Sequence, residues 1–298
     1  MARDGGLEVW RGCVNAWECD ELGHMNVRFY LARAFDGLAR LAAALGQPHA
    51  FAPEATATLQ ISHQHVRFLR EAKPGASLHM TGGLVEMHED GALILQVLHH
   101  HDGQPCAAIL SRVLHATPLG RPFPWPARAL DAAGGLTVAT PEFAAPRNFT
   151  GQETSDPEAC WTRDLEVISL GPVSLRECDV FGYMTPDTVL ARISDGMNAL
   201  TAPIYAELEV LEPGRRLNTA ALEYRIDHFE RPRVGDLVEV RSRIVGVAEK
   251  LISVEHWLCD PASRRVWARA RGIHANFDLD TRKVAPIPAK VRERFTAI

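Results

Sequence analysis

The chain has 298 residues, of which 46% are hydrophobic and 23% are charged, as expected of a soluble globular protein with two domains or one doubled domain. Its 32 basic and 37 acidic residues give a net charge of −5 without a basic run, which argues against a nucleic-acid partner. No apolar stretch approaches the roughly 18 residues of a membrane span, and the N-terminus lacks a signal-peptide core, so we expect a cytoplasmic protein with no membrane partner.

The cysteine and histidine positions do not predict a metal site. The six cysteines form no CxxC pair and are expected to be reduced, small apolar residues. The histidines include the run His99-His100-His101, but successive strand residues point to opposite faces, so the run cannot place three ligands on one ion. We therefore expect no bound metal.

The first 117 residues predict one helix and an antiparallel sheet. After a short strand at 7–13, apolar residues from Val27 to Leu45 recur every three or four positions and predict a helix that stops at Gly46. The period then becomes that of strands, with turn signals such as Lys73-Pro-Gly75 between them. These strands are expected at 58–68, 77–86, 93–100 and 107–115.

The rest of the chain predicts a connection and a second set of the same elements. The segment from Pro118 to Ala159 has seven prolines and no sustained period, and we expect it to pack along both halves. A helix follows, with Thr185 as N-cap, Pro186 at the first helical position and an apolar stripe from Leu190 to Ile204. Strands are expected at 220–229, 237–247, 251–258 and 266–277. The predicted domains are 1–117 and 161–298, joined by a linker at 118–160.

The two halves repeat each other in sequence as well as in pattern. The segment Glu18-Cys-Asp20-Glu-Leu-Gly23-His-Met25 recurs 159 residues later as Glu177-Cys-Asp179-Val-Phe-Gly182-Tyr-Met184. Ten of the 21 positions from 18 to 38 are identical in the second copy, where unrelated sequences would share about one or two. The chain is therefore interpreted as an internal duplication.

The turn before the first helix resembles a known family. The residues that carry the resemblance are Asp20, Gly23, His24, Asn26 and Tyr30, echoed by Asp179, Gly182 and Leu190. They resemble the motif of the hotdog fold of the 4-hydroxybenzoyl-CoA thioesterase type, and the resemblance covers both halves apart from the linker. It implies an α+β fold of two tandem hotdog domains, each an antiparallel sheet wrapped around a long helix, forming an intramolecular pseudo-dimer. It also implies an acyl-CoA thioesterase with an acyl-CoA substrate.

The residues of the turn suit this chemistry. Thioester hydrolysis needs a group that attacks or activates an oxygen nucleophile, and Asp20 can be the nucleophile or a general base on water. It also needs donors for the charge on the carbonyl oxygen, which the unbonded N–H groups of a helix start supply. In the family this donor is the N–H seven positions after the aspartate, which here belongs to Val27. We expect His24 and Asn26 to orient Asp20 or a water, and Gly23 to let the backbone approach the thioester.

The second copy departs from the motif where this chemistry is concentrated. Its equivalent of Val27 is Pro186, which has no N–H to donate. His24 and Asn26 are replaced by Tyr183 and Thr185. We therefore expect one working site at Asp20 and a second site at Asp179 and Tyr183 that is degenerate or repurposed. The helix charges Arg33 and Asp36, which recur as Arg192 and Asp195, are interpreted as structural.

Further substrate contacts are expected from both halves. Tyr30 belongs to the motif, and Glu223 and Arg225 are candidates for the other wall of the Asp20 site. Arg70 and Lys73, or Arg231 and Arg233 in the equivalent loop of the second half, are candidates for binding the coenzyme A phosphates, or are ordinary solvated loop charges. Coenzyme A is part of the substrate, so no separate cofactor is expected.

Two other functions remain open from the sequence. Asp20 and His24 form an acid/base pair suited to a hotdog enoyl-CoA hydratase or dehydratase. A non-catalytic acyl-CoA-binding protein would keep the fold without turnover. The acyl group, the choice between coenzyme A and acyl carrier protein, the pathway and any assembly into homo-oligomers are not determined by these residues.

Overall fold

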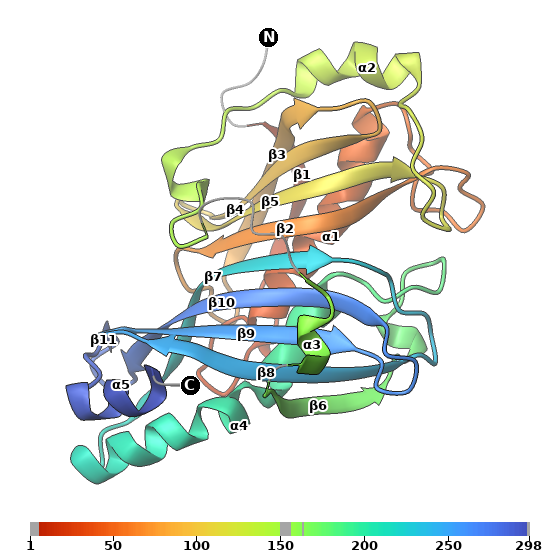
Figure 1. The fold of residues 1–298 in the computed structure, drawn as a ribbon. Helices are drawn as coiled ribbons and strands as arrows, with labels where there is room; N and C mark the ends of the chain where they lie inside the picture. The colour runs from red at the N-terminus through yellow and green to blue at the C-terminus, as the bar shows by residue number, and fades with distance from the viewer. Residues whose placement is uncertain (1–5, 150–155, 163, 297–298) are drawn as a thin grey trace. The chain divides into compact units, whose positions relative to one another are not determined.

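A computed structural model describes residues 6–149, 156–162 and 164–296, which form two compact units (Figure 1). Unit 1 consists of Met1–Arg147 and Leu175–Thr188, and unit 2 of Asn148–Ser174 and Val189–Ile298. The turn that contains Asp179, and the first residues of the helix after it, therefore belong to unit 1 together with the whole Asp20 turn.

Unit 1 contains an antiparallel sheet with the strand order β1-β3-β4-β5-β2. Its long helix, α1, lies against one face of this sheet (Figure 1). The predicted strands are confirmed to within two residues at each end. The elements are β1 (Leu7–Cys13), α1 (Val27–Ala44), β2 (Thr58–Phe68), β3 (Ser77–Met87), β4 (Gly91–His100) and β5 (Pro105–Ala116).

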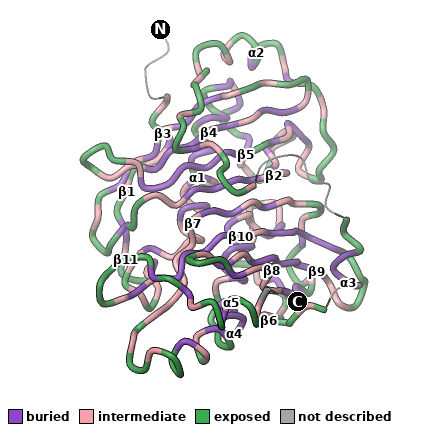
Figure 2. Tube along the Cα trace, turned by 60° about the vertical axis from the view of Figure 1, so that its left-hand side comes forward, coloured by how far each residue is buried: buried purple, intermediate pink, exposed green. Residues whose placement is uncertain are grey.

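The predicted apolar stripe of α1 becomes the core of unit 1. Leu31, Leu38 and Leu41 are fully buried. Buried residues also form long stretches of the strands of this unit (Figure 2). Gly37 allows close packing, because a Cβ atom there would lie 2.6 Å from Gln96 Nε2. Gln96 in turn donates a hydrogen bond to the Ala34 carbonyl at 2.8 Å, which ties the helix to β4. Gly46, at φ +75°, ends the helix as predicted.

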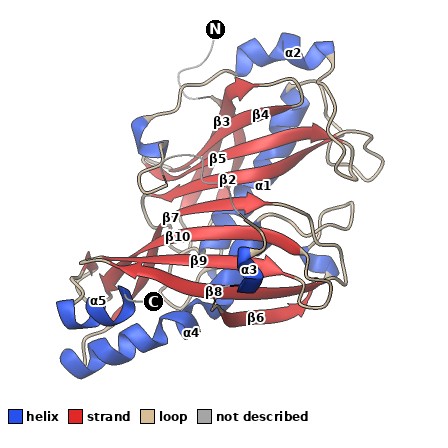
Figure 3. Cartoon of the chain, viewed as in Figure 1, coloured by secondary structure: helices blue, strands red, loops and turns tan. Residues whose placement is uncertain are grey.

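Unit 2 contains a second antiparallel sheet, ordered β7-β10-β9-β8-β6, with β11 beside β10. Helix α4 packs on one face through Met197, Leu200 and Ile204, which contact Ile252 and Val254. The predicted helix stripe and sheet are therefore confirmed (Figure 3). The elements are β6 (Glu166–Pro172), α4 (Asp187–Leu211), β7 (Leu217–His228), β8 (Leu237–Val247), β9 (Leu251–Cys259), β10 (Val266–Asp278) and β11 (Lys283–Val284).

The predicted linker at 118–160 is divided between the two units after Arg147, and it is more structured than its prolines indicated. In unit 1 it contains α2 (Ala127–Ala133) and the 3-10 turns η2 (Gly134–Leu136) and η3 (Glu142–Ala144), and Trp125 stacks on His115 with ring centroids 4.6 Å apart. In unit 2 it contributes α3 (Ala159–Thr162), whose Cys160 packs with Trp257 and Cys259. These elements are shorter than the window in which helical periodicity can be recognised, so the pattern missed them.

Two further differences lie at helix boundaries and at the C-terminus. Helix α4 begins at Asp187, one residue after the predicted Pro186. The sequence pattern also missed β11 and α5 (Ala289–Thr296), although Val291 of α5 is fully buried against the core of unit 2. Among the helices that the structure describes, none is both long and apolar enough to cross a membrane.

Candidate active site

The Asp20 turn connects η1 (Ala16–Glu18) to the start of α1. Asp20 Oδ1 accepts hydrogen bonds from the N–H groups of Leu22 at 3.0 Å and His24 at 3.4 Å. Gly23 has φ +79°, and no atom lies within 4 Å of the place where its Cβ would be, so the backbone conformation rather than space requires glycine. The carboxylate of Asp20 therefore organises the turn on which it sits.

The Asp20 carboxylate is held in a partly dehydrated position. Its side chain is 23% exposed, and burial raises its pKa above the ordinary value, opposed by the N–H and charge of His24. His24 lies between two carboxylates, with Nδ1 3.7 Å from Asp20 Oδ1 and Nε2 3.3 Å from Glu71 Oε1. The side-chain contacts of Asp20 among the described residues all use Oδ1, which leaves Oδ2 for a substrate or a water.

Glu71 is the site residue that sequence reasoning missed. It lies 47 positions after His24, in the loop that follows β2, and no spacing rule connects the two. The backbone brings them together, because the Met25 N–H donates to the Ala72 carbonyl at 2.8 Å. The contact between His24 and Glu71 could be predicted only by knowing which backbone segments pair in the folded chain.

The start of α1 leaves one backbone donor unused. The Asn26 side chain caps the helix by accepting the Arg28 N–H at 3.1 Å, and the Phe29 N–H donates to the Asn26 carbonyl at 3.0 Å. None of the described residues accepts a hydrogen bond from the Val27 N–H. This N–H and the positive end of the helix dipole together favour a negative charge at Val27.

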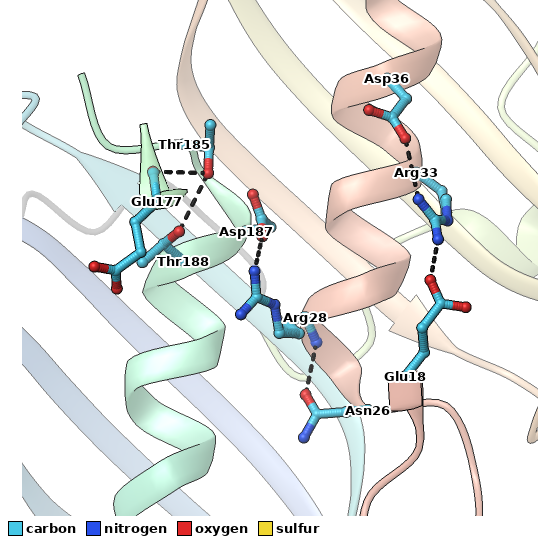
Figure 4. A network of polar contacts seen from close by, with 9 residues as sticks. All are labelled: Glu18, Asn26, Arg28, Arg33, Asp36, Glu177, Thr185, Asp187 and Thr188. Atoms are coloured by element: carbon cyan, nitrogen blue, oxygen red, sulfur yellow. Dashed lines mark hydrogen bonds and ion pairs between the residues drawn. The ribbon is translucent and has the colours of Figure 1, made fainter. Parts of the chain in front are cut away.

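The second copy has the same turn but a different helix start. After η4 (Leu175–Glu177), Asp179 Oδ1 accepts the N–H groups of Phe181 at 2.9 Å and Tyr183 at 3.0 Å. Because α4 begins at Asp187, the prediction of Thr185 as N-cap was wrong, and Pro186 is the residue before the helix. The Thr185 hydroxyl lies 3.2 Å from the Glu177 carbonyl and 3.1 Å from the Thr188 hydroxyl (Figure 4). Pro186 follows, so the donor available at Val27 has no counterpart here.

The repeated charges of α1 make structural contacts. Arg33 donates to the buried carboxylate of Glu18 and, at 3.3 Å, to Asp36, which lies one turn further along the helix (Figure 4). In the second copy, Arg192 donates to the carbonyls of Gly171 and Pro172. These contacts agree with the structural role predicted for both arginines.

The predicted substrate contacts of unit 1 lie in two different environments. Tyr30 is buried and its ring meets the edge of Phe68, with centroids 5.2 Å apart. Arg70 is 56% exposed, with Nη1 3.9 Å from Asp102 Oδ2, and Lys73 is exposed in the same loop. Their part in binding substrate stays a prediction.

Glu223 and Arg225 lie on β7, in unit 2. Glu223 is buried and accepts hydrogen bonds from the backbone N–H of Asn148 at 3.2 Å and its side-chain amide at 2.7 Å. Arg225 Nε lies 3.7 Å from an oxygen of Asp227. Glu223 thus holds Asn148 of the linker, and a role for either residue in binding substrate stays a prediction.

Within residues 6–149, 156–162 and 164–296, no three His, Cys, Asp or Glu side chains are grouped so that they could hold a metal ion. The site itself presents the carboxylate of Asp20, the ring of His24 and the backbone N–H of Val27.

The sequence pattern of the thioesterase-like superfamily matches residues 14–133 and 173–295. The chain belongs to this superfamily. The predicted tandem of hotdog-type regions and the predicted class of enzyme, a thioester hydrolase, are thereby confirmed. No curated protein sequence matches the chain.

Solved structures with the same tandem fold extend over nearly the whole chain. The 12:0-ACP thioesterase from Umbellularia californica has a TM-score of 0.67 and 10% identity, covering 90% of this chain and 93% of its own. An acyl-ACP thioesterase from Bacteroides thetaiotaomicron has a TM-score of 0.63 and 11% identity, covering 89% and 96%. A protein assigned as an oleoyl thioesterase from Lactobacillus plantarum has a TM-score of 0.67 and 12% identity, covering 92% and 98%. At these identities the likeness shows the fold alone.

Proposed function

We propose that this thioesterase-like protein hydrolyses acyl-CoA thioesters at the Asp20 turn. The observation that carries the proposal is the combination of a partly buried carboxylate with one oxygen uncommitted and, seven residues later, an unbonded N–H at Val27. The first supplies or activates the oxygen nucleophile, and the second stabilises the charge that develops on the carbonyl oxygen.

Two routes begin from the ionised Asp20. In the first, Oδ2 attacks the thioester carbonyl, the C–S bond breaks to release coenzyme A thiolate, and water hydrolyses the resulting mixed anhydride. In the second, Asp20 takes a proton from a water, which attacks the carbonyl directly, and the C–S bond then breaks to release coenzyme A thiolate, which takes up a proton. In both routes the Val27 N–H faces the developing oxyanion, a contact that contributes roughly 3 to 4 kcal/mol in enzymes that depend on it.

The neighbouring residues have supporting roles in this proposal. His24 lies against Asp20 and orients it or the attacking water, while Asn26 sets the first turn of α1 through its bond to Arg28. Gly23 holds the turn in its left-handed conformation. In this proposal Arg70 and Lys73, which are exposed, bind the phosphates of coenzyme A.

The second copy does not form an equivalent site in this proposal. Asp179 keeps the two N–H bonds of its turn, but Pro186 offers no donor to an oxyanion. One active site per chain follows, with Asp20 as its carboxylate.

The test is a thiol-release screen over short, long, branched and aromatic acyl-CoAs. Matched acyl-ACP substrates are included because two of the tandem neighbours are named as thioesterases of that carrier. We expect release of thiol by the wild-type protein and almost none by Asp20→Asn. Loss of enoyl absorbance without thiol release would instead indicate a hydratase. Stabilisation by acyl-CoA without turnover would indicate a binding protein, and either result would disprove the proposal.

A further inference from the structure

An ion pair joins the starts of the two long helices. Arg28 Nη2 donates to Asp187 Oδ2 at 2.9 Å (Figure 4). The two residues are separated by 159 positions, which is the offset of the repeat, so they are equivalent positions of the two copies. Both lie in unit 1, and the Asp187 side chain is only 7% exposed.

The ion pair is the last link of a chain of contacts around Val27. The Glu18 carbonyl accepts the Asn26 N–H at 2.8 Å, and the Asn26 side chain accepts the Arg28 N–H at 3.1 Å. The Arg28 side chain then binds Asp187. The residues on both sides of Val27 are therefore fixed, one through its backbone and the other through its side chain.

Neither charge of this pair is easily replaced by another group. Asp187 binds the Arg28 guanidinium through Nη2, and the guanidinium also lies over the Phe29 ring, 5.1 Å from its centroid. Arg28 Nε is buried and has no hydrogen-bond partner among the described residues. Asp187 opens α4, where a negative charge complements the helix dipole. Burial raises the pKa of Asp36, and Arg33 opposes this effect. The negative charge of Asp187 raises the pKa of Asp36 further, so the carboxylates of Asp36 and Asp187 repel each other.

We propose that Arg28 and Asp187 are positioning residues that aim the Val27 N–H at the thioester oxygen, so that the start of the second copy supports the active site of the first. The inference rests on the proposed thioesterase function. Pro186, just before the second long helix, has no backbone N–H to donate to an oxyanion. The next residue, Asp187, binds Arg28 of α1, the helix that begins with the Val27 N–H. A displacement of about 1 Å at a reacting group costs on the order of 100-fold in rate, so a partial loss of this brace is measurable.

The experiment compares kcat and KM for Asp187→Asn, Arg28→Lys and the charge-swapped double variant Arg28→Asp with Asp187→Arg. We expect Asp187→Asn to lower kcat about tenfold with KM within about twofold, because an oxyanion donor acts in the transition state. Arg28→Lys keeps the positive charge on a different head group, so its kcat should lie between that of Asp187→Asn and that of the wild type. The double variant should recover kcat to within about threefold of the wild type.

The matched control is Glu230→Gln, which removes the exposed ion pair with Arg265 in unit 2 and should leave kcat unchanged. A wild-type kcat in Asp187→Asn, a change confined to KM or melting temperature, or no recovery in the double variant would overturn the inference. If Asp187→Asn does not fold, Arg28→Lys and the double variant decide by the same criteria. A wild-type protein that releases no thiol refutes the proposed function itself, whereas an active wild type with an equally active Asp187→Asn refutes only the positioning role.

Discussion

Asp20 and Asp179 hold their turns in the same way, each accepting through Oδ1 the N–H groups two and four residues ahead. Gly23 and Gly182 share φ +79° within these turns. The aspartate of the motif is thus a turn-forming residue in both copies. The proposed catalysis in the first copy therefore depends on more than the turn, and the two copies differ at the start of the helix, where Val27 has an N–H and Pro186 has none.

Substitution of each aspartate by asparagine separates the turn from the chemistry. An asparagine oxygen can still accept the two N–H groups, so Asp20→Asn and Asp179→Asn should each change the free energy of unfolding by less than about 1 kcal/mol. Asp20→Asn should lower kcat by about 100- to 10,000-fold, the range for loss of a positioned base, while Asp179→Asn retains most activity. Urea unfolding and thiol release measure the two effects. Equal losses of activity would contradict a single active site.

Val27→Pro tests the backbone donor by removing its hydrogen. Asn26 has φ −59° and ψ 142°, a conformation suited to the residue before a proline, and proline is well tolerated at the first position of a helix. The protein should therefore keep its melting temperature to within a few degrees while kcat falls about 100- to 1,000-fold. Val27→Ala, which retains the N–H, should stay within about threefold of wild type. A fully active Val27→Pro would place the oxyanion donor elsewhere.

Arg33→Met should destabilise the protein by roughly 3 kcal/mol, because it leaves the buried Glu18 carboxylate without its guanidinium partner. Asp36→Asn is the matched control. Its side chain is half-exposed, and loss of such a pair costs less than about 1 kcal/mol. Chemical unfolding of the two variants measures the difference, and equal destabilisation would show that Glu18 does not depend on Arg33.

Two buried histidines predict acid sensitivity of unit 2. His256 Nδ1 lies 2.7 Å from Ser242 Oγ, and His274 Nε2 lies 2.8 Å from Tyr224 Oη. Burial lowers the pKa of His256 to about 3 and that of His274 to about 4. In the unfolded chain both regain a pKa near 6.5, so the unfolded state binds more protons at mildly acidic pH.

The stability contributed by these histidines is complete above about pH 6.5 and is lost as the pH falls towards 4. The expected slope is about 1.4 kcal/mol per pH unit for each histidine. His256→Gln should make the dependence of unfolding free energy on pH shallower, with a difference that grows from near zero at pH 7.5 towards this value at pH 5, as measured by urea unfolding across that range. Identical slopes for the variant and the wild type would show that His256 titrates normally in the folded protein.

Much of the fold could be predicted from the sequence, because the apolar residues of each half recur first with the period of a helix and then with that of strands. The stripe from Val27 to Leu45 and the strands after it are long enough to show their periods, and their bounds were predicted closely. Helices α2 and α3 and strand β11 are too short to show one. Tertiary contacts such as those of Trp125 and Cys160 fix the linker helices in place.

The local contacts of the candidate site could also be predicted from the sequence, whereas its distant contacts could not. The turn of Asp20 and the capped start of α1 depend on residues within eight positions of one another, so the motif contained them. Glu71 reaches His24 from a loop beyond β2, and only the folded backbone reveals it. The repeat does not predict the contact between Arg28 and Asp187, because a repeat is recognised by identical residues and the residues at this position differ between the copies.

The ion pair between Arg28 and Asp187 joins two positions that descend from one ancestral position. In a two-fold dimer of identical chains a single codon specifies both equivalent residues, and a contact between them always sets like against like. When the two copies are fused in one gene, positions 28 and 187 have separate codons. One position can then encode arginine and the other aspartate, so an ion pair between them becomes possible. A mutation at either codon then occurs once per molecule, and its compensating change lies 159 codons away.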